Sequence, residues 1–348
     1  MPPPEFQKVI VVQTAFPGDV ILTLPLVQAL KHIRPSAFID VLVIPGASAI
    51  LKNHPAIRDI LVYDKRNTES GIGGFLGQVR RMRARRYDVA FIPHRSFRSA
   101  ALAAFSGIPR RIGFETSAGR FLLTDRIRYK HSLHEVDRNL SLLEGIGLEH
   151  PLRQYPDLYP SDQDRAVVDD FLRNSTAPLV GIAPGTVWRT KQWLPERFAG
   201  LVSRLSHESV TVILIGGESD RELCDAMVPA GGSKRVLSAA GKLTLLQSAE
   251  LIRRCAVLVS NDSAPMHCGV AMRTPVVAIF GATVPAYGFA PYGESDVIVE
   301  INGLSCRPCS IHGGAECPIH TFECMKMISS ETVFEHVASI LTKAHGRQ

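Results

Sequence analysis

The chain has 348 residues, of which 45% are hydrophobic and 21% are charged. This length suggests about two domains, each large enough to bury its own core, and the composition excludes a disordered, collagenous or coiled-coil protein. The net charge is +6, but residues 1–150 carry +8 and residues 151–348 carry −2. The basic first half therefore suits a phosphate-rich substrate, an anionic membrane or nucleic acid.

Apolar, β-branched runs alternate along the chain with longer segments of helical period. A strand is predicted over residues 8–14, then a helix over 19–34 and a second strand over 38–45. Further strands are predicted over 88–93, 179–184, 210–217, 255–260 and 275–281. Continuous Val, Ile and Leu runs are typical of parallel strands that helices cover on both faces. The sequence therefore predicts an α/β protein and excludes all-α and all-β folds.

A Pro- and Asp-rich stretch interrupts this pattern at residues 150–178, and it predicts one domain over 1–172 and another over 173–348. Both domains open with a strand, a polar loop that contains Pro-Gly, and a helix. This order fits two stacked doubly wound halves. In such folds, ligands bind at the carboxyl ends of the parallel strands.

The first half offers a candidate base and several candidate cationic ligands. In "QTAFPGDVILTLP", Asp19 stands where a helix begins, so it is either a helix N-cap or a general base that faces the inter-domain cleft. The run "RRMRARR" at 80–86 is either a solvated helix face or part of an anion-binding surface. Arg66, Arg95, Arg98 and Arg111 extend the basic character of this half.

Three loops of the second half each follow a predicted strand. The loop "APGTVWRTKQWLPERF" brings Thr186, Thr190 and Lys191 before a helix, which is a suitable cradle for a diphosphate although it lacks P-loop spacing. Glu218 follows the next strand and is either a ribose-binding acid or part of a helix start. In "VSNDSAPMH", Asp262 and Ser263 either cap a helix that begins near residue 266 or line the same ligand site.

Three blocks of sequence, taken together, carry a family resemblance. "FPGDVILTLPLVQAL", "PGTVWRTKQWLPERFAGLV" and "SNDSAPMHCGVAMRTPVVAIFGATVPAYGFAPYG" resemble, in this order and spacing, the lipopolysaccharide heptosyltransferases of glycosyltransferase family 9. The resemblance implies a GT-B fold, in which two Rossmann-like, doubly wound parallel-sheet domains face a cleft. It also implies an inverting transfer of heptose from ADP-L-glycero-D-manno-heptose to the inner core of lipopolysaccharide, with acceptor bound by the first domain and donor by the second.

The resemblance also implies roles for individual residues. Asp19 matches the general base, and Thr186, Thr190 and Lys191 match the block that binds the donor diphosphate. Glu218 matches a ribose-binding acid, and Asp262, Ser263 and His267 match the block that faces the donor sugar and diphosphate. Candidates for binding the phosphorylated Kdo/heptose lipid A acceptor are Arg66, Arg95, Arg98 and Arg111. The reaction requires no cofactor. Many family members have Gly where this chain has Ala264, followed by Pro265, so we expect a donor-sugar pocket of different shape.

Four cysteines, Cys306, Cys309, Cys317 and Cys324, lie close together in the segment 306–324, with a C-x2-C-x7-C-x6-C spacing. They are either ligands of a structural zinc ion or free thiols in a packed loop. A similar Cys-rich tail occurs in the heptosyltransferase II branch of the family that this chain resembles.

The expected location follows from the apolar runs and the start of the chain. No apolar run reaches the roughly 18 residues of a membrane span, and the start lacks a secretory leader. We therefore expect a cytoplasmic enzyme that binds peripherally to the anionic inner membrane. Nucleic acid is not an expected partner, because no aromatic residues interleave the basic run. Two alternatives are a GT-B enzyme with another nucleotide sugar or acceptor, including a sugar-nucleotide epimerase, and a non-catalytic basic binding module.

Overall fold

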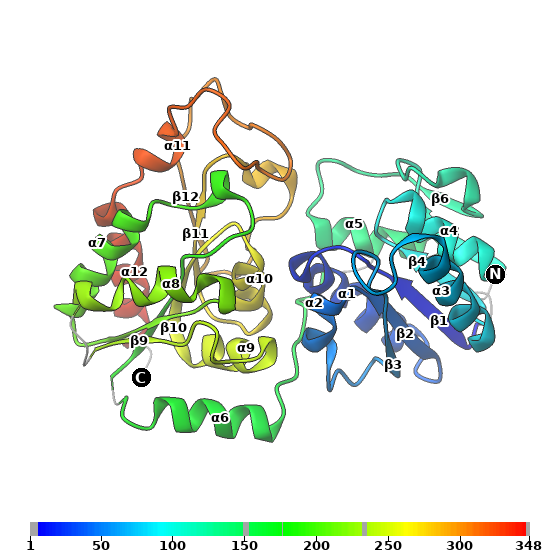
Figure 1. Ribbon diagram of the computed structural model, residues 1–348, viewed down its shortest axis with the longest axis horizontal. Coiled ribbons are helices and arrows are strands. Elements are labelled where there is room, and N and C mark those ends of the chain that lie inside the picture. The colour runs from blue at the N-terminus through cyan, green and yellow to red at the C-terminus, as the bar shows by residue number, and fades with distance from the viewer. Residues whose placement is uncertain (1–5, 149–152, 176, 232–234, 346–348) are drawn as a thin grey trace. The chain divides into compact units, whose positions relative to one another are not determined.

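The computed structural model describes residues 6–148, 153–175, 177–231 and 235–345. The chain divides into two compact units, Met1–Tyr159 and Pro160–Gln348 (Figure 1). Each unit contains one six-stranded parallel sheet with helices packed against it, so the predicted α/β class is confirmed. The predicted boundary at 172/173 lies one helix later than this division. Helix α6 (Asp162–Leu172) belongs to the second unit because it packs against α9 and because Asp169 pairs with Arg254 there at 2.7 Å.

The first unit has a Rossmann-like sheet with the strand order β3-β2-β1-β4-β5-β6. Its elements, in which η denotes a 3-10 helix, are β1 (Lys8–Val12), α1 (Pro17–Ile33), β2 (Phe38–Val43), α2 (Pro45–Ser48), η1 (Ala49–Leu51), β3 (Asp59–Val62), α3 (Gly71–Arg85), β4 (Val89–Ile92), α4 (Phe97–Phe105), β5 (Arg110–Phe114), η2 (Arg120–Leu122), β6 (Asp125–Ile127), α5 (Glu135–Ser141) and η3 (Leu142–Ile146).

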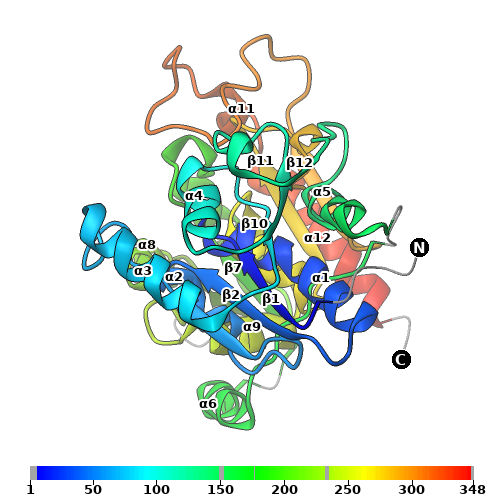
Figure 2. The same cartoon turned by 90° about the vertical axis from the view of Figure 1, so that its right-hand side faces the viewer.

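Helices cover both faces of this sheet, which explains the continuous apolar run of β1. Helices α3 and α4 pack side by side over one face and enclose a core that includes Ile10, Val79 and Met82 (Figure 2). Helices α1 and α5 also pack against each other. Helix α1 starts at Pro17, which fits the first turn of a helix, and continues through Pro25. Asn139 of α5 donates to the carbonyl of Leu22 inside α1 and so helps to fix the two helices together.

The second unit repeats the same strand order in its own sheet, β12-β11-β10-β7-β8-β9. After α6, its elements are β7 (Leu179–Ala183), η4 (Arg189–Lys191), α7 (Pro195–Ser206), β8 (Thr211–Leu214), η5 (Glu218–Asp220), α8 (Arg221–Asp225), η6 (Val228–Gly231), β9 (Val236–Ser238), α9 (Leu245–Arg254), β10 (Cys255–Asn261), α10 (Ala264–Ala271), β11 (Val276–Phe280), η7 (Pro285–Tyr287), β12 (Val297–Glu300), α11 (Glu323–Lys326) and α12 (Ser330–His345).

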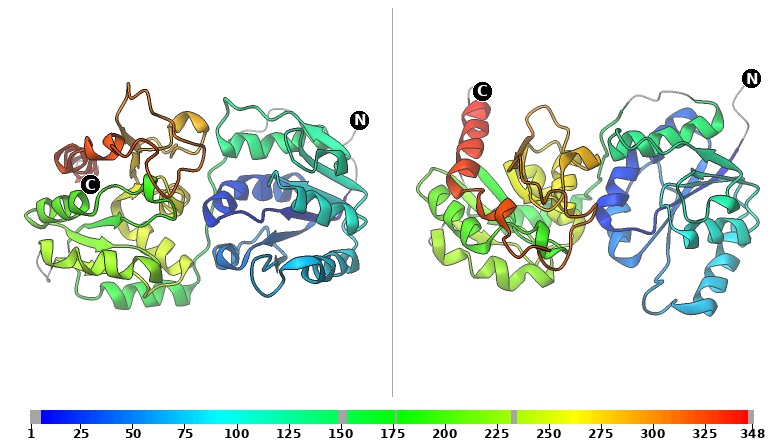
Figure 3. Two further views of the ribbon diagram at one scale, coloured as in Figure 1. Left: turned by 45° about the horizontal axis from the view of Figure 1, so that its top comes forward. Right: turned by 90° about the horizontal axis from the view of Figure 1, so that it is seen from above.

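One core cluster of the second unit lies between its sheet and helices α7 and α12. Trp193 and Phe198 are fully buried there, with their ring centroids 4.8 Å apart. Helix α12, drawn in red in Figure 3, packs against α7 and β10. Among the residues that the structure describes, no helix combines the length and apolar character that spanning a bilayer would need.

Candidate functional site

Asp19 lies in the first turn of α1, at the carboxyl edge of the first sheet. It is the third residue of the helix, and its carboxylate accepts a hydrogen bond from the backbone N–H of Phe16 at 3.2 Å. The N-cap is therefore Phe16, and Asp19 is not a cap residue in the strict sense. The first turn of a helix carries a partial positive charge, which stabilises the ionised form of a carboxylate placed there.

Glu135 lies close enough to Asp19 for the two charges to interact, and Arg95, Arg138 and Tyr129 interact in turn with Glu135. We term these five residues the Asp19 cluster. The Nε of Arg138 donates to Glu135 at 2.7 Å, and both side chains are largely buried. The guanidinium groups of Arg95 and Arg138 lie 4.2 and 5.1 Å from the ring centroid of Tyr129. Burial raises the pKa of Glu135, the nearby charge of Asp19 adds to this rise, and Arg138 opposes it. The cluster therefore places two acidic groups beside two guanidinium groups and an aromatic ring.

Lys65 and His94 tie together the loops that follow β1, β3 and β4. The ammonium of Lys65 donates to the carbonyl of Thr14 at 2.7 Å, and the hydroxyl of Thr14 lies 3.0 Å from Nδ1 of His94. Burial, followed by the charges of Arg66 and Arg98, lowers the pKa of Lys65. Burial and the neighbouring cations also lower the pKa of His94 to about 4, so this imidazole is neutral at pH 7.

The four predicted acceptor arginines do not all lie at this edge. Arg66 is exposed in the loop after β3, and Arg98 is exposed in the first turn of α4, where it donates to the hydroxyl of Tyr63 at 2.9 Å. Arg95 belongs to the Asp19 cluster. Arg111 instead pairs with the first half of β4, at the amino end of the sheet, where its guanidinium donates to carbonyls of η2 and of the turn before β5. The structure therefore separates Arg111 from the other three and gives it a structural role.

Three residues from separate strand ends form a second group, which we term the Lys191 cluster. The ammonium of Lys191 lies 2.7 Å from Oδ2 of Asp262, and the hydroxyl of Thr283 donates to the same oxygen at 2.7 Å. Asp262 is buried, and the side chain of Lys191 is only 14% exposed. A lysine ammonium has three donors, so donors remain after the bond to Asp262. Asp262 thus holds Lys191 in place and leaves it able to bind an anion.

The Asn261-Asp262-Ser263 segment joins neighbouring loops at this edge, and its side chains do not cap helix α10. Asn261 is fully buried and joins two loops, since it accepts from the N–H of Trp193 and donates to the carbonyl of Pro184, both at 2.9 Å. Ser263 occupies the N-cap position of α10, but its hydroxyl donates to the carbonyl of Asn261 at 3.3 Å. Its side chain makes no capping bond to the helix.

Helix α10 begins at Ala264 rather than near residue 266. Ala264 and Pro265 are its first two residues, positions where proline is well tolerated. Neither residue is among the described residues with a left-handed backbone. The replacement of a family glycine by Ala264 therefore causes no backbone conflict here, and the expected change in pocket shape finds no support in the backbone.

The remaining predicted donor residues lie on three loops or helices at the same edge. Thr186 is half-buried in the loop after β7, and His267 is buried within α10. Glu218 begins η5, after β8, and is exposed next to Arg221, with which it pairs at 2.6 Å. Gly185 faces the carboxylate of Asp220 so closely that a Cβ at this position would collide with it. The loops after β7 and β8 are therefore packed directly together.

Thr190 has a structural role that the sequence did not reveal. Its hydroxyl donates to the carbonyl of Gly314 at 3.0 Å and accepts from the N–H of Gly314 at 2.7 Å, and its own N–H donates to the same carbonyl at 3.1 Å. Because the side chain is also buried, the geometry does not favour the predicted contact of this hydroxyl with a diphosphate. Thr190 instead anchors the Cys-rich segment 306–324 beside Lys191.

Arg307 anchors the start of the Cys-rich segment. Its buried guanidinium donates to the carbonyls of Gly281 and Thr283 at 2.5 and 2.8 Å and pairs with Glu300 at 2.8 Å. The N–H of Cys309 donates to the carbonyl of Ala282 at 2.9 Å. The segment is thus fixed at Thr190 and at the loop that contains Thr283, so it contacts both sides of the Lys191 cluster.

The four cysteines of this segment are free thiols. Burial opposes ionisation of Cys317, but N–H groups of residues 319–322 outweigh it and lower the pKa of this thiol. Burial raises the pKa of Cys324 to about 11. Across the described parts of the chain, no group of three or more His, Cys, Asp or Glu side chains is arranged to hold a metal ion. The thiols as placed do not form a zinc ligand set, and the zinc site stays a prediction.

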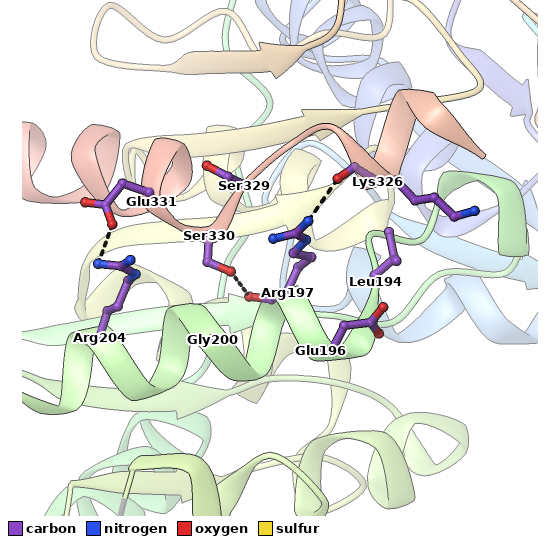
Figure 4. Close-up of a pocket in the computed structure, with 9 residues that line it drawn as sticks. All are labelled: Leu194, Glu196, Arg197, Gly200, Arg204, Lys326, Ser329, Ser330 and Glu331. Atoms are coloured by element: carbon purple, nitrogen blue, oxygen red, sulfur yellow. Dashed lines mark hydrogen bonds and ion pairs between the residues drawn. The ribbon is translucent and has the colours of Figure 1, made fainter. Parts of the chain in front are cut away.

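Two cavities of the second unit lie near these elements. One, of about 690 Å³, is lined by η4, the start of α7 and the Cys-rich segment, including Thr190 and Cys317. The other, of about 630 Å³, lies between α7 and α12 (Figure 4). In it, Ser330 donates to the carbonyl of Arg197 at 2.8 Å, and Arg204 pairs with Glu331. These groups satisfy one another, and none of the predicted site residues lines this groove.

Comparison with known proteins adds a family to this geometry. Residues 77–319 match the model of glycosyltransferase family 9 (heptosyltransferase). The chain is 29% identical to lipopolysaccharide heptosyltransferase 2 of Salmonella typhimurium over 80% of this chain and 84% of that protein.

Solved structures agree with the fold. The crystal structure of the glycosyl transferase family 9 from Veillonella parvula has a TM-score of 0.87 at 23% identity and covers 97% of this chain and 98% of its own. The structure of the E. coli ADP-heptose lps heptosyltransferase II has a TM-score of 0.81 at 24% identity, and the match covers 97% of this chain and 100% of that chain. The predicted GT-B type of architecture is thereby confirmed.

Proposed function

The chain belongs to glycosyltransferase family 9, the heptosyltransferases, and we propose that it transfers heptose from ADP-L-glycero-D-manno-heptose to the inner core of lipopolysaccharide, inverting the anomeric carbon. The observation that carries this proposal is the family match over residues 77–319. The similarity to lipopolysaccharide heptosyltransferase 2 supports the choice of acceptor.

Asp19 is the general base of the proposed reaction. It removes the proton of an acceptor hydroxyl while that oxygen attacks the anomeric carbon, and the bond from this carbon to the diphosphate breaks on the opposite side. A base near the nucleophile is sufficient for an inverting transfer, because no covalent intermediate forms. The position of Asp19 in the first turn of α1 and beside Arg95, Glu135 and Arg138 supports this role.

Lys191 stabilises the departing diphosphate in the proposed reaction. Its ammonium is a charge-assisted donor, and the positive end of a helix adds to the attraction of an anion. Asp262 and Thr283 support this role because they fix the ammonium. Thr186, Glu218, Ser263 and His267 contribute the remaining donor contacts in the proposal.

The acceptor is a phosphorylated, Kdo-containing lipid A, and Arg66, Arg95 and Arg98 bind its anionic groups. The net charge of +8 over residues 1–150 supports this assignment, because a cationic edge concentrates anionic substrates. Since such an acceptor is anchored in lipid, the proposal places the enzyme peripherally at the cytoplasmic face of the inner membrane.

A panel of nucleotide sugars with a Kdo-containing lipid A acceptor tests this function. We expect transfer from ADP-heptose and a loss of about 10³-fold in kcat for Asp19→Asn, since a positioned base contributes about 10² to 10⁴. The affinity for ADP should change little in this variant. Asp88→Asn is the matched control, because Asp88 accepts from the N–H of Lys8 at the amino end of the sheet. Turnover of a UDP-sugar without any response to ADP-heptose contradicts the proposal and favours another transferase or an epimerase.

A further inference from the structure

The outward face of the α3–α4 layer in the first unit exposes large apolar side chains that neither the fold nor the Asp19 cluster uses. Five are strongly exposed, namely Ile72 (78%), Phe121 (66%), Phe105 (56%), Phe97 (50%) and Leu76 (43%). Single exposed apolar residues are ordinary, whereas a contiguous group of them marks an interaction surface.

These side chains occupy three neighbouring elements. Phe97 and Phe105 are the first and last residues of α4, and the residues from Ser99 to Ala103 are buried, so the two rings project from the two ends of the helix. Phe105 touches Phe75 of α3, with ring centroids 6.1 Å apart, and Phe97 touches Phe121 of η2 at 6.0 Å. Helix α4 packs against both α3 and η2, and Figure 2 shows α3 and α4 side by side. The five side chains therefore project from three elements that pack together, and we term the surface of these elements the α3–α4 face.

The charged residues of these three elements are all basic. The sequences of α3, α4 and η2 include no aspartate or glutamate. Arg81 and Arg85 are paired with Glu69 and Asp59 from outside these elements. Arg80, Arg86 and Arg120 are exposed. The α3–α4 face thus combines projecting aromatic and aliphatic groups with exposed guanidinium groups on or next to the same elements.

From this combination we propose that the α3–α4 face docks the protein on the surface of an anionic lipid bilayer. Aromatic and aliphatic groups insert at the boundary between headgroups and acyl chains, while arginines bind the lipid phosphates. The absence of carboxylates from the three elements favours a uniformly anionic lipid surface over a protein partner of mixed charge. The biological purpose of this docking rests on the proposed function. The inference adds to that function the surface that brings the enzyme to a lipid-anchored acceptor.

Vesicle flotation without any substrate tests the docking surface. We expect the protein to bind vesicles of phosphatidylglycerol and phosphatidylethanolamine at least about 10-fold more tightly than phosphatidylcholine vesicles, and less tightly as salt rises. Arg80→Glu with Arg120→Glu should weaken binding by about 25-fold or more, since each arginine near the surface contributes a factor of about five. Phe97→Ser with Phe121→Ser should weaken it by about 10-fold.

A matched control uses the exposed face of α6 in the second unit. Val167→Ser with Arg165→Glu makes one apolar and one charge change there, and it should leave vesicle binding unchanged. Binding that is equal in the wild type and both α3–α4 variants, or that is absent, overturns the inference. A third outcome is a dimer in light scattering that does not bind vesicles and that dissociates in the variant Phe97→Ser with Phe121→Ser. This outcome overturns the inference in favour of an interface between two copies.

A soluble acceptor separates this inference from the proposed function. On a Kdo-containing saccharide without acyl chains, Phe97→Ser with Phe121→Ser should keep kcat/KM within about twofold, because neither residue belongs to the Asp19 cluster. On acceptor embedded in anionic vesicles, the same variant should lose about 10-fold, in parallel with its weaker binding. Loss of rate on both acceptors overturns the docking role. Vesicle binding without any transfer activity leaves the docking surface standing and contradicts the proposed function.

Discussion

The two units have the same strand order but different chemistry at the carboxyl edges of their sheets. In the first unit, this edge carries the Asp19 cluster, in which Arg95 and Arg138 lie against Tyr129 and Arg138 pairs with Glu135, and it carries Lys65 bonded to Thr14. In the second unit, the edge carries the Lys191 cluster, which the Cys-rich segment contacts from two sides. The topology determines where a ligand binds, and the residues at the strand ends determine which ligand it is.

The two edges also differ in how their key charged groups are held. Lys191 is held by an ion pair to Asp262, whose own position depends on Thr283. Glu135 is held by Arg138, and a second carboxylate lies close by. In the proposed reaction, one edge stabilises an anionic leaving group and the other removes a proton within a cationic surrounding. Substitutions at each edge should have distinct consequences.

Lys191→Met should give the largest effect, because it removes the charge that we propose binds the diphosphate and leaves Asp262 buried without its ammonium partner. We expect kcat/KM to fall by about 10³-fold, in the range of a lost electrostatic stabiliser, and ADP to bind at least about 10-fold more weakly. Isothermal titration with ADP and steady-state kinetics measure the two effects. Lys242→Met is the matched control, since its ammonium donates to the carbonyl of Ser238 at 2.8 Å. An unchanged ADP affinity in Lys191→Met would remove the distinction between the two edges.

Arg138→Met should have its main effect on the stability of the first unit. Glu135 would then be buried without the guanidinium that now lies 2.7 Å away, and breaking a buried pair costs about 3–5 kcal/mol. Urea unfolding measures this loss. Arg138→Met with Glu135→Gln should recover much of it, because the uncompensated charge is also removed. Equal loss in the single and double variants contradicts the pairing, while Arg153→Met, at an exposed pair with Asp137, provides a control with a small effect.

The fold and the second edge could be predicted from sequence better than the first edge could. Buried parallel strands appear as continuous apolar runs, so the class and both sheets followed from the pattern. Lys191 and Asp262 each follow a strand end, and the meeting of such ends in a parallel sheet brings them together. Arg111 was misplaced because the basic character of the first half says nothing about the two ends of a strand.

Other residues could not be recognised because their roles depend on distant partners. Thr190 bonds to Gly314, which lies more than a hundred positions away. A hydroxyl just before a helix is also typical of a ligand-binding residue, so the sequence could not distinguish the two roles. Glu135 and Arg138 were missed although their spacing of three residues is that of neighbours on a helix. Their functional signal is burial beside Asp19, which appears only when α5 packs against α1.

His94 allows a test of the first edge by pH. Its pKa is lowered to about 4 by burial and by the charges of Lys65 and Arg95, whereas an exposed histidine has a value of about 6.5. The unfolded chain therefore takes up a proton below pH 6.5 that the folded chain does not. The contribution of His94 to stability is complete above pH 6.5 and is lost as the pH falls toward 4. We expect it to amount to about 3 kcal/mol across this window.

Urea midpoints at pH 7.5 and pH 4.5 measure this contribution. His94→Asn should show a smaller loss of stability between the two values than the wild type does. His54, whose pKa burial also lowers to about 4, lies in the same unit, so part of the dependence should persist in the variant. An identical loss in wild type and His94→Asn contradicts the idea that His94 is kept neutral at this edge.

Thr190→Val should have the smallest effect and should sharpen the contrast with a residue that binds donor directly. Valine has a similar shape but cannot bond to Gly314, and an unsatisfied buried polar group costs about 1–3 kcal/mol. Because the Cys-rich segment also contacts Lys191, we expect kcat to fall by about 10-fold with little change in KM for the donor. Thr190→Ser keeps the hydroxyl and should restore kcat. Thr186→Val should instead raise this KM with kcat nearly unchanged. If Thr190→Val raises KM as Thr186→Val does, the hydroxyl of Thr190 binds donor after all, and the Cys-rich segment loses its role in positioning Lys191.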